Sequence, residues 1–399
     1  MVRILFVCRF LPHQSAKDSG RQDTYHYLSS LSQRHEVSVI AFVPEQDFTA
    51  IRELEVICRR VVAVTYKHDE LPSRLWRALG RVVMPRVYGR NLSITYRRSL
   101  KKLISEEDFN VFVVDGSMAP YIRLLSGGIR LLDEVDIYAE VAYEEHLQEK
   151  RLFRRWLANL DWRRTLRREL IYAAMADGVL VRSQKDKRYL KERLPDQEIS
   201  ILSPWFEGLD ELRQIGTQRP DGNIVLFVGA LAIPANQEAA IYFARDVLPL
   251  LKSKVTDVEF MIVGSQPDSR VRALDGLPGV TVVGEVEELT PYYQMASVNV
   301  VPLFTGGGII VKTLNGLASG RPTVASHAGN SGTGARNGEH LVLVNGGAEE
   351  FSKSVERVLT DDDLWHRLAR DGRAYVEHSF NWSTIIQEFE LFMEHITQI

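Results

Sequence analysis

Short apolar runs alternate with longer amphipathic stretches along most of the chain. The runs contain few polar positions, which is typical of strands in a parallel sheet covered on both faces. In the first half they predict strands over 3–8, 37–42, 61–65, 111–114, 130–132, 178–181 and 199–202. In the second half they predict strands over 224–230, 259–263, 280–283, 298–303 and 341–344, and another that opens at Pro322. Helical patterns separate these strands, so the sequence predicts an α/β protein built from βαβ units. After the strand over 224–230 and a loop, the next helix is expected from about Gln237.

Length and charge divide this pattern into two domains. A chain of 399 residues is too long for one ordinary hydrophobic core. Residues 1–205 contain 34 Lys and Arg against 27 Asp and Glu, or +7, and the remainder contains 15 against 25, or −10. These sum to the net charge of −3. The sequence therefore predicts a domain boundary near Pro204 and a first domain that attracts anionic partners.

One stretch, residues 297–326, combines a strand, a glycine turn, a helix over about 309–319 and a second strand. In the turn, Gly306, Gly307 and Gly308 have no Cβ to obstruct a ligand, and the helix that follows presents free backbone N–H groups. Lys312, one turn into that helix, can bring an ammonium group over the same place. This order of elements predicts a site for an anion.

The same stretch resembles the donor-binding element of retaining GT-B glycosyltransferases of the GT4 type, the glycosyl transferases group 1. The matching residues are Pro302, Leu303, the three glycines, Lys312, Leu314, Ala318, Gly320 and Pro322. The resemblance implies an α/β GT-B fold, with two doubly wound Rossmann-like domains facing a cleft. It also implies an acceptor-side domain over 1–204, a nucleotide-sugar-binding domain over 205–380, and a C-terminal helix over 381–399 that packs back on the first domain.

The family's donor site transfers residue by residue onto this chain. The donor-binding positions are Gly229, Ala230, Pro234, Asn236, Gly264, Gly284, Val286, Gly306, Gly307, Gly308, Ile309, Ile310, Lys312 and Asn315. The chain departs from the pattern in three places: Asn315 replaces a glutamate that holds the ribose, Gly307 replaces another acidic residue, and Ala230 and Leu231 stand where most relatives have a phosphate-binding arginine. These departures leave Lys312 as the one evident cation at the phosphate.

The resemblance implies a hexosyltransferase that moves a sugar, with retention and without a metal or other cofactor, from a UDP- or GDP-type donor to an acceptor hydroxyl. The acceptor class stays open between a glycan, as in polysaccharide biosynthesis, a lipid-linked molecule and a natural product. The catalytic candidates are Lys312, Asp133, Gly307 and Gly308. In the family's front-face mechanism the departing phosphate accepts the acceptor's proton, so no carboxylate base is required.

Candidates for the acceptor or sugar side are Ser19, Gly20, Arg21, Asp115, Asp136 and His327. The aspartates, with Asp133, follow predicted strands, where open α/β sheets bind ligands. Each residue also has an ordinary structural explanation: Ser19, Asp133 or Asp136 as a helix cap, and Arg21 or His327 as a solvated side chain.

Two basic regions stand apart from these motifs. Residues 71–104 contain nine Lys and Arg and no Asp or Glu, and the region 71–105 is a candidate for contact with an anionic membrane or acceptor. The alternative is a solvated helical face, with a short helix ended by Pro85. We interpret residues 139–175 as connector helices with solvated charge. No nucleic-acid-binding module accompanies either region.

The two cysteines and the absence of a dinucleotide-binding motif restrict the compartment and the class of protein. Cys8 and Cys58 lie in predicted core segments, which favours a reducing, cytoplasmic compartment with peripheral membrane contact at most. Three alternatives to sugar transfer remain. They are a GT-B sugar-nucleotide epimerase, a degenerate relative that binds nucleotide or glycan without turnover, and an NAD-dependent oxidoreductase. The last is the least favoured, because this chain has no G-x-G-x-x-G after its first strand.

Overall fold

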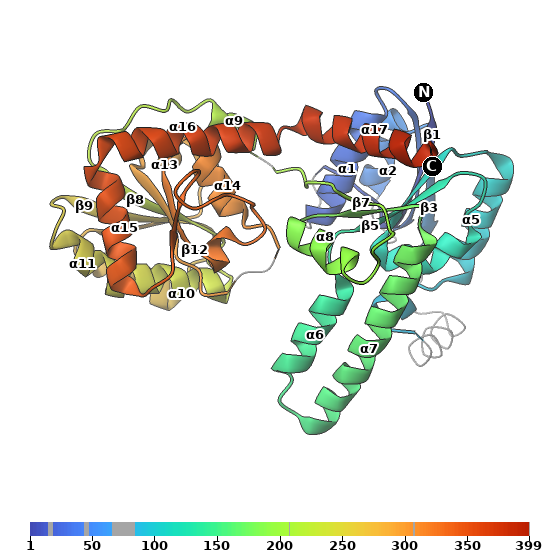
Figure 1. The fold of residues 1–399 in the computed structure, drawn as a ribbon, viewed down its shortest axis with the longest axis horizontal. Coiled ribbons are helices and arrows are strands. Elements are labelled where there is room, and N and C mark those ends of the chain that lie inside the picture. The colour runs from blue at the N-terminus through green and yellow to red at the C-terminus, as the bar shows by residue number, and fades with distance from the viewer. Residues whose placement is uncertain (15–18, 44–47, 66–83, 207, 306–307, 399) are drawn as a thin grey trace. The chain divides into compact units, whose positions relative to one another are not determined.

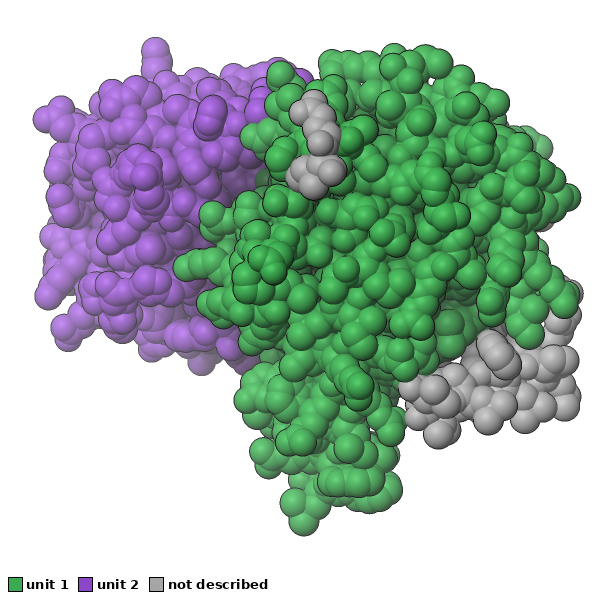
Figure 2. Space-filling model, turned by 45° about the vertical axis from the view of Figure 1, so that its right-hand side comes forward, with its two compact units in different colours: residues 1–205, 385–399 green, residues 206–384 purple. Residues whose placement is uncertain are grey.

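The computed structural model describes residues 1–399 except 15–18, 44–47, 66–83, 207, 306–307 and 399. The chain forms two compact units, shown in different colours in Figure 2. Unit 1 consists of residues 1–205 and 385–399, and unit 2 consists of residues 206–384.

Unit 1 is built on a seven-stranded parallel sheet with the order β3-β2-β1-β4-β5-β6-β7. Its strands are β1 Arg3–Phe10, β2 Glu36–Val43, β3 Arg60–Thr65, β4 Val111–Asp115, β5 Ile129–Glu134, β6 Gly178–Val181 and β7 Ile199–Ile201. The five residues from Ile4 to Cys8 are all buried, as expected for a strand covered on both faces.

The helices of unit 1 are α1 Ser19–Leu31, α2 Phe48–Ile57, α4 Arg86–Gly89, α5 Ile94–Glu106, α6 Tyr138–Gln148, α7 Leu152–Met175 and α8 Gln184–Lys191, with a 3-10 turn, η1, over Gly116–Leu124. The helix expected before Pro85 lies outside the described residues. Helix α17, Trp382–Gln398, returns to this unit. Its Glu390 accepts a hydrogen bond from Arg34 at 2.7 Å, and its Phe389 ring lies 6.1 Å from that of Tyr27. The predicted packing of the C-terminal helix on the first unit is confirmed.

Unit 2 contains a six-stranded parallel sheet with the order β10-β9-β8-β11-β12-β13. Its strands are β8 Asn223–Val228, β9 Val258–Val263, β10 Val280–Gly284, β11 Val298–Val301, β12 Thr323–Ser326 and β13 Val342–Val344. Its helices are α9 Leu209–Arg213, α10 Pro234–Tyr242, the π turn η2 Phe243–Val247, α11 Leu248–Lys252, α12 Ser269–Arg272, α13 Thr290–Met295, α14 Val311–Ala318, α15 Ala348–Thr360 and α16 Asp362–Ser379, with 3-10 turns η3 Ala273–Gly276 and η4 Ala328–Asn330. Figure 1 shows these helices around the sheet.

Two parallel sheets, each ordered outward from a central strand, are the predicted doubly wound arrangement, and the α/β class is confirmed. In unit 2 a fully buried Trp365 from α16 donates its indole N–H to the carbonyl of Ser297 at 2.7 Å, which fixes the helix to the start of β11. None of the described helices is both long enough and apolar enough to cross a membrane.

Candidate functional site

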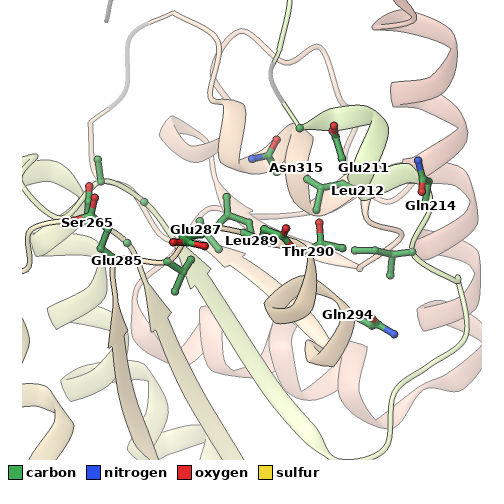
Figure 3. A pocket seen from close by; sticks show the side chains of 18 of the residues that line it. Glu211, Leu212, Gln214, Ser265, Glu285, Glu287, Leu289, Thr290, Gln294 and Asn315 are labelled. Carbon is green, nitrogen blue, oxygen red and sulfur yellow. The ribbon is translucent and has the colours of Figure 1, made fainter. Parts of the chain in front are cut away.

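The carboxyl ends of β8, β9 and β10 border a cavity of about 990 Å³ in unit 2. Its lining includes Gly229 and Ala230 after β8, Gly264 after β9, Val286 after β10 and Asn315 from α14. The structure thus brings five of the predicted donor-binding residues to one pocket. Figure 3 shows Asn315, Glu211 and Leu212 on one side of this pocket and Ser265 and Glu285 on the other. Ligands of open α/β sheets bind at this edge.

The floor of the pocket depends on a close approach of two backbone segments. A Cβ atom added to Gly264 would lie 1.8 Å from the carbonyl oxygen of Gly229. The Gly264 N–H donates to the carbonyl of Gly284 at 2.8 Å, so the ends of β8, β9 and β10 are held together here. Only glycine fits at position 264.

Lys312 is not among the residues that line this pocket, but it lies against Gly229, which is one of them. Its Nζ donates to Oδ1 of Asn236 at 2.8 Å, and Nδ2 of Asn236 donates to the carbonyl of Ala230, also at 2.8 Å. A Cβ atom added to Gly229 would contact both Asn236 and Cε of Lys312. Burial lowers the pKa of Lys312 from 10.5 to about 8. Over the described part of the chain no carboxylate pairs with it, so its ammonium group is desolvated and lacks a counter-charge.

Two helices begin beside this lysine. Helix α14 starts at Val311, and its N-cap residue Ile310 makes no side-chain capping bond. The N–H of Thr313 donates to the carbonyl of Ile310 at 3.1 Å, so among the described residues the N–H groups of Val311 and Lys312 are those of the first turn that stay available to a ligand. Helix α10 starts at Pro234, three residues earlier than the expected start near Gln237. Proline is well tolerated in the first turn because the N–H that it lacks would have no acceptor there. The earlier start places Asn236 in the first turn of a helix.

The glycine turn is described only in part. Gly306 and Gly307 lie outside the described residues, while Gly308 has φ +66°, in the left-handed region that favours glycine. Ile309 and Ile310 are half-buried, and their side chains pack against the cores on the two faces of the sheet. Their side chains therefore belong to the cores, and the N–H of Ile310 is also engaged, because it donates to the carbonyl of Ser331 at 3.1 Å.

Asn315 presents an unusual polar environment. Its Oδ1 is buried and has no hydrogen-bond partner within the described ranges, and neither has the hydroxyl of the neighbouring Tyr293. Burial raises the pKa of Tyr293, and the nearby Asn315 side chain partly offsets this. The next residue, Gly316, lets α14 lie directly against β11, because an added Cβ would fall 2.2 Å from Nδ2 of Asn299. Asn315 thus offers the pocket a polar side chain whose oxygen the neighbouring Tyr293 hydroxyl can also reach.

The pocket also contains four carboxylates that sequence reasoning missed. Glu285, Glu287 and Glu288 lie in the loop after β10, and Glu211 comes from α9. The first three could have been found, since they adjoin the predicted donor-binding residues Gly284 and Val286. No sequence pattern marked Glu211, which follows the domain boundary.

A second cavity, of about 340 Å³, lies in unit 1 at the carboxyl ends of β1, β4 and β5. Its lining brings together five residues predicted for the acceptor side or catalysis: Gly20, Arg21, Asp115, Asp133 and Asp136. Arg9, Arg90 and Tyr138 complete it, and sequence reasoning did not single them out for this place. Ser19 is the first residue of α1, and its side chain lies outside what the structure describes.

The aspartates of this cavity differ in their roles. Asp133 forms two hydrogen bonds with buried Arg182, at 2.7 and 3.0 Å, so it is an ion-paired residue and not a helix cap. Asp115 accepts from the N–H of Ser117 at 2.7 Å and caps η1, and burial raises its pKa. Asp136 is exposed and the predicted cap of the next helix is wrong, because α6 has Ile137 at its N-cap without a side-chain bond.

His327 lies apart from both cavities. It lines a third cavity of about 240 Å³ in unit 2, with Tyr242 and Phe304, and hydrogen-bonds Oδ1 of Asn345. Within the described residues no cluster of three or more His, Cys, Asp or Glu side chains has the arrangement of a metal site.

Comparison with known proteins agrees with this geometry. Residues 222–361 match the family described as glycosyl transferases group 1. The chain is 28% identical over 130 residues to an uncharacterized 44.6 kDa protein in the cps region of Klebsiella pneumoniae, a match covering 30% of this chain and 33% of that protein. It is 28% identical over 180 residues to D-inositol 3-phosphate glycosyltransferase of Acidothermus cellulolyticus, covering 42% of this chain and 40% of that one. The matches thus span well under half of each curated relative.

Solved structures resemble the chain over its whole length. Sucrose-phosphate synthase from Thermosynechococcus elongatus has a TM-score of 0.63 at 17% identity and covers 99% of both chains. Anabaena Alr3699/HepE in complex with UDP has a TM-score of 0.64 at 13% identity and covers 100% of both chains. The same protein in complex with UDP-glucose gives 0.59 at 14% identity, again over 100% of both. At these identities the likeness establishes the fold, which is GT-B.

Proposed function

We propose that this chain, whose residues 222–361 match the glycosyl transferases group 1 family and whose fold is GT-B, transfers a sugar from a nucleotide-diphosphate sugar to an acceptor hydroxyl. The nucleotide part of the donor occupies the cavity of about 990 Å³ in unit 2. The observation that supports this best is Lys312. Within the described residues this half-buried ammonium group bonds to a neutral amide and to no carboxylate. It lies beside two helix starts, so it gains most from an anionic ligand.

In this proposal the residues of unit 2 stabilise the leaving group. As the bond between sugar and phosphate breaks, negative charge grows on the diphosphate oxygens. The ammonium group of Lys312 and the N–H groups of Ala235 in α10 and of Val311 in α14 are fixed in place before the reaction, so they stabilise that charge without having to reorganise. The turn at Gly284 and Val286 meets the base, and Asn315 offers the ribose a neutral hydrogen-bonding group.

The finer assignments belong to the same proposal. A UDP-glucose type donor is supported by the structural neighbour solved with UDP-glucose, and polysaccharide assembly by the relative from a cps region. The cavity of unit 1, with Arg9, Arg21 and Asp136, is a candidate for the acceptor or sugar side. We also propose, from sequence alone, that the basic region 71–105 contacts an anionic membrane or acceptor in the cytoplasm; residues 66–83 lie outside the described residues.

The experiment is a panel of nucleotides and nucleotide sugars tested by thermal shift, followed by product analysis with and without acceptor. A specific donor should raise the melting temperature in proportion to RT ln(1 + [L]/Kd). Transfer to an acceptor supports the proposal. Conversion of the donor without any acceptor indicates an epimerase, and binding without turnover indicates a degenerate relative. If no nucleotide stabilises the protein, the assignment of this pocket is wrong.

A further inference from the structure

Helices α6 and α7 form a hairpin that extends away from the sheet of unit 1, visible in both Figure 1 and Figure 2. At its root, the buried carboxylate of Glu169 accepts from the N–H of Ala139 at 3.3 Å. Halfway along, the ring of Trp162 lies 4.8 Å from that of Tyr143 and is parallel to that of His146. The two helices therefore pack against each other through their inner faces, and these packing contacts extend from the sheet as far as His146.

Beyond these contacts, the side chains at the tip of the hairpin are exposed. All eight residues from 150 to 157 are exposed, on every side of the first turns of α7. At the tip the most exposed apolar side chains are Leu152, Phe153 and Trp156, at 85%, 70% and 57%. Seven of the sixteen large apolar residues that the described chain exposes lie within 141–157, so the exposure is concentrated at one place. Such a patch indicates an interaction surface.

The charges at the tip have one sign. Residues 147–157 contain Lys150, Arg151, Arg154 and Arg155 against Glu149 alone, so the net charge is 4 − 1 = +3. Glu149 is used locally, since its carboxylate accepts from the N–H of Arg151 at 2.9 Å. Within the described ranges none of the four basic side chains forms an ion pair. The apolar and basic residues alternate along the same turns.

We propose that residues 147–157, the hairpin tip, dock on the surface of an anionic lipid bilayer. Leu152, Phe153 and Trp156 enter the boundary between head groups and acyl chains, and the four basic side chains meet the lipid phosphates. Aromatic and aliphatic side chains interleaved with Lys and Arg are what such an interface favours.

A second copy of the chain is a poorer occupant. A two-fold contact through the tip would place its three arginines against their own copies, which is repulsive. The tip is also a narrow protrusion and offers a protein partner little area compared with the roughly 1,200 Å² or more of a stable interface. This inference does not rest on the proposed sugar transfer, because the hairpin belongs to unit 1 and the nucleotide pocket to unit 2.

The test is sedimentation of the full chain with vesicles of phosphatidylcholine, alone or in an equimolar mixture with phosphatidylglycerol. The native protein should bind the mixed vesicles and not the neutral ones. The triple variant Leu152→Ser, Phe153→Ser, Trp156→Ser should bind about tenfold more weakly or worse. The matched control is Val56→Ser with Leu391→Ser, which removes apolar side chains exposed at 86% and 55% elsewhere on unit 1, and it should bind like the native protein.

Three further measurements separate the alternatives. Replacing Arg151, Arg154 and Arg155 by Gln should weaken binding and reduce its salt dependence, whereas melting temperatures should not change because these side chains are exposed and form no ion pair within the described ranges. Bromine-labelled acyl chains should quench less fluorescence in Trp156→Phe than in the native protein. The proposal is overturned if the native protein ignores mixed vesicles or if the tip variants bind normally. It is equally overturned if ultracentrifugation shows that those variants change only the oligomeric state.

Discussion

Lys312 allows the sharpest test of the nucleotide pocket, because its ammonium group is already destabilised in the free protein. Burial lowers its pKa from 10.5 to about 8, which corresponds to about 3 kcal/mol against the charged form. Partial exposure of the side chain reduces the usable part to about 1–2 kcal/mol. A bound diphosphate provides the missing counter-charge and returns the pKa toward its usual range.

The consequence is a pH-dependent affinity. Below pH 8 the Lys312 side chain of the free protein is already protonated. Above pH 8 it is mostly neutral, so binding of the diphosphate requires the uptake of a proton. Binding of a nucleoside diphosphate should therefore weaken by about tenfold from pH 7 to pH 9, since the phosphate itself ionises below pH 7. Isothermal titration at constant ionic strength measures this. Lys312→Arg, which stays charged throughout, should remove the slope, and Lys312→Met should bind about 30-fold or more weakly at pH 7.

Stability gives a second readout with the opposite sign. The folded-state pKa of this lysine is depressed, so its penalty is fully present below pH 8 and disappears as pH rises toward 10.5. In the absence of ligand, Lys312→Met should therefore melt higher than the native protein at pH 7 while binding nucleotide worse. An affinity that is flat between pH 7 and pH 9, or a Met variant that binds normally, would refute the phosphate assignment.

Three other substitutions test the remaining geometry. Gly264→Ala places a Cβ 1.8 Å from a backbone carbonyl and should cost about 3 kcal/mol or more in chemical denaturation, whereas Gly276→Ala, with open space around it, should be close to neutral; equal effects would contradict the close approach. Arg182→Met leaves Asp133 buried without its partner and should cost about 3–5 kcal/mol, most of which the double variant with Asp133→Asn should restore; no recovery would mean that the pair is not coupled. Asn315→Glu should tighten donor binding by about 1 kcal/mol with an unchanged melting temperature, and a lower melting temperature without tighter binding would exclude a working ribose site.

The sequence was sufficient for the fold because the strands are nearly continuous apolar runs. β6 begins and ends where its apolar run predicts, and most other strands differ by one or two residues at their ends. The start of α10 was misplaced for a specific reason. Pro234 and the small residues around it look like a loop, although proline is compatible with the first turn of a helix. The error mattered, because it hid the second helix start at the pocket.

Pairings between distant residues could not be predicted. Lys312 and Asn236 are 76 positions apart, and Asp133 and Arg182 are 49 apart on neighbouring strands. A pattern in one sequence shows which residue types follow each strand, but it does not show which distant side chain each of these residues contacts. For Asp133 this left a helix cap and a ligand contact as the alternatives, whereas the structure shows an ion pair.

The charges in unit 2 also determine how a nucleotide sugar can lie there. The lining of the large cavity contains Glu211, Glu285, Glu287 and Glu288, whereas Lys312 lies outside that lining, next to Gly229 and Asn236. A diphosphate beside these carboxylates would experience repulsion of about 1 kcal/mol or more from each close one and would lose its cation. By contrast, these carboxylates can accept hydrogen bonds from the hydroxyl and amide groups of a nucleoside. The anionic end of a donor is therefore directed to Lys312 and its nucleoside to the glutamates. Asn315 lines the cavity together with these glutamates. The nucleoside site therefore contains carboxylates even though position 315 has none.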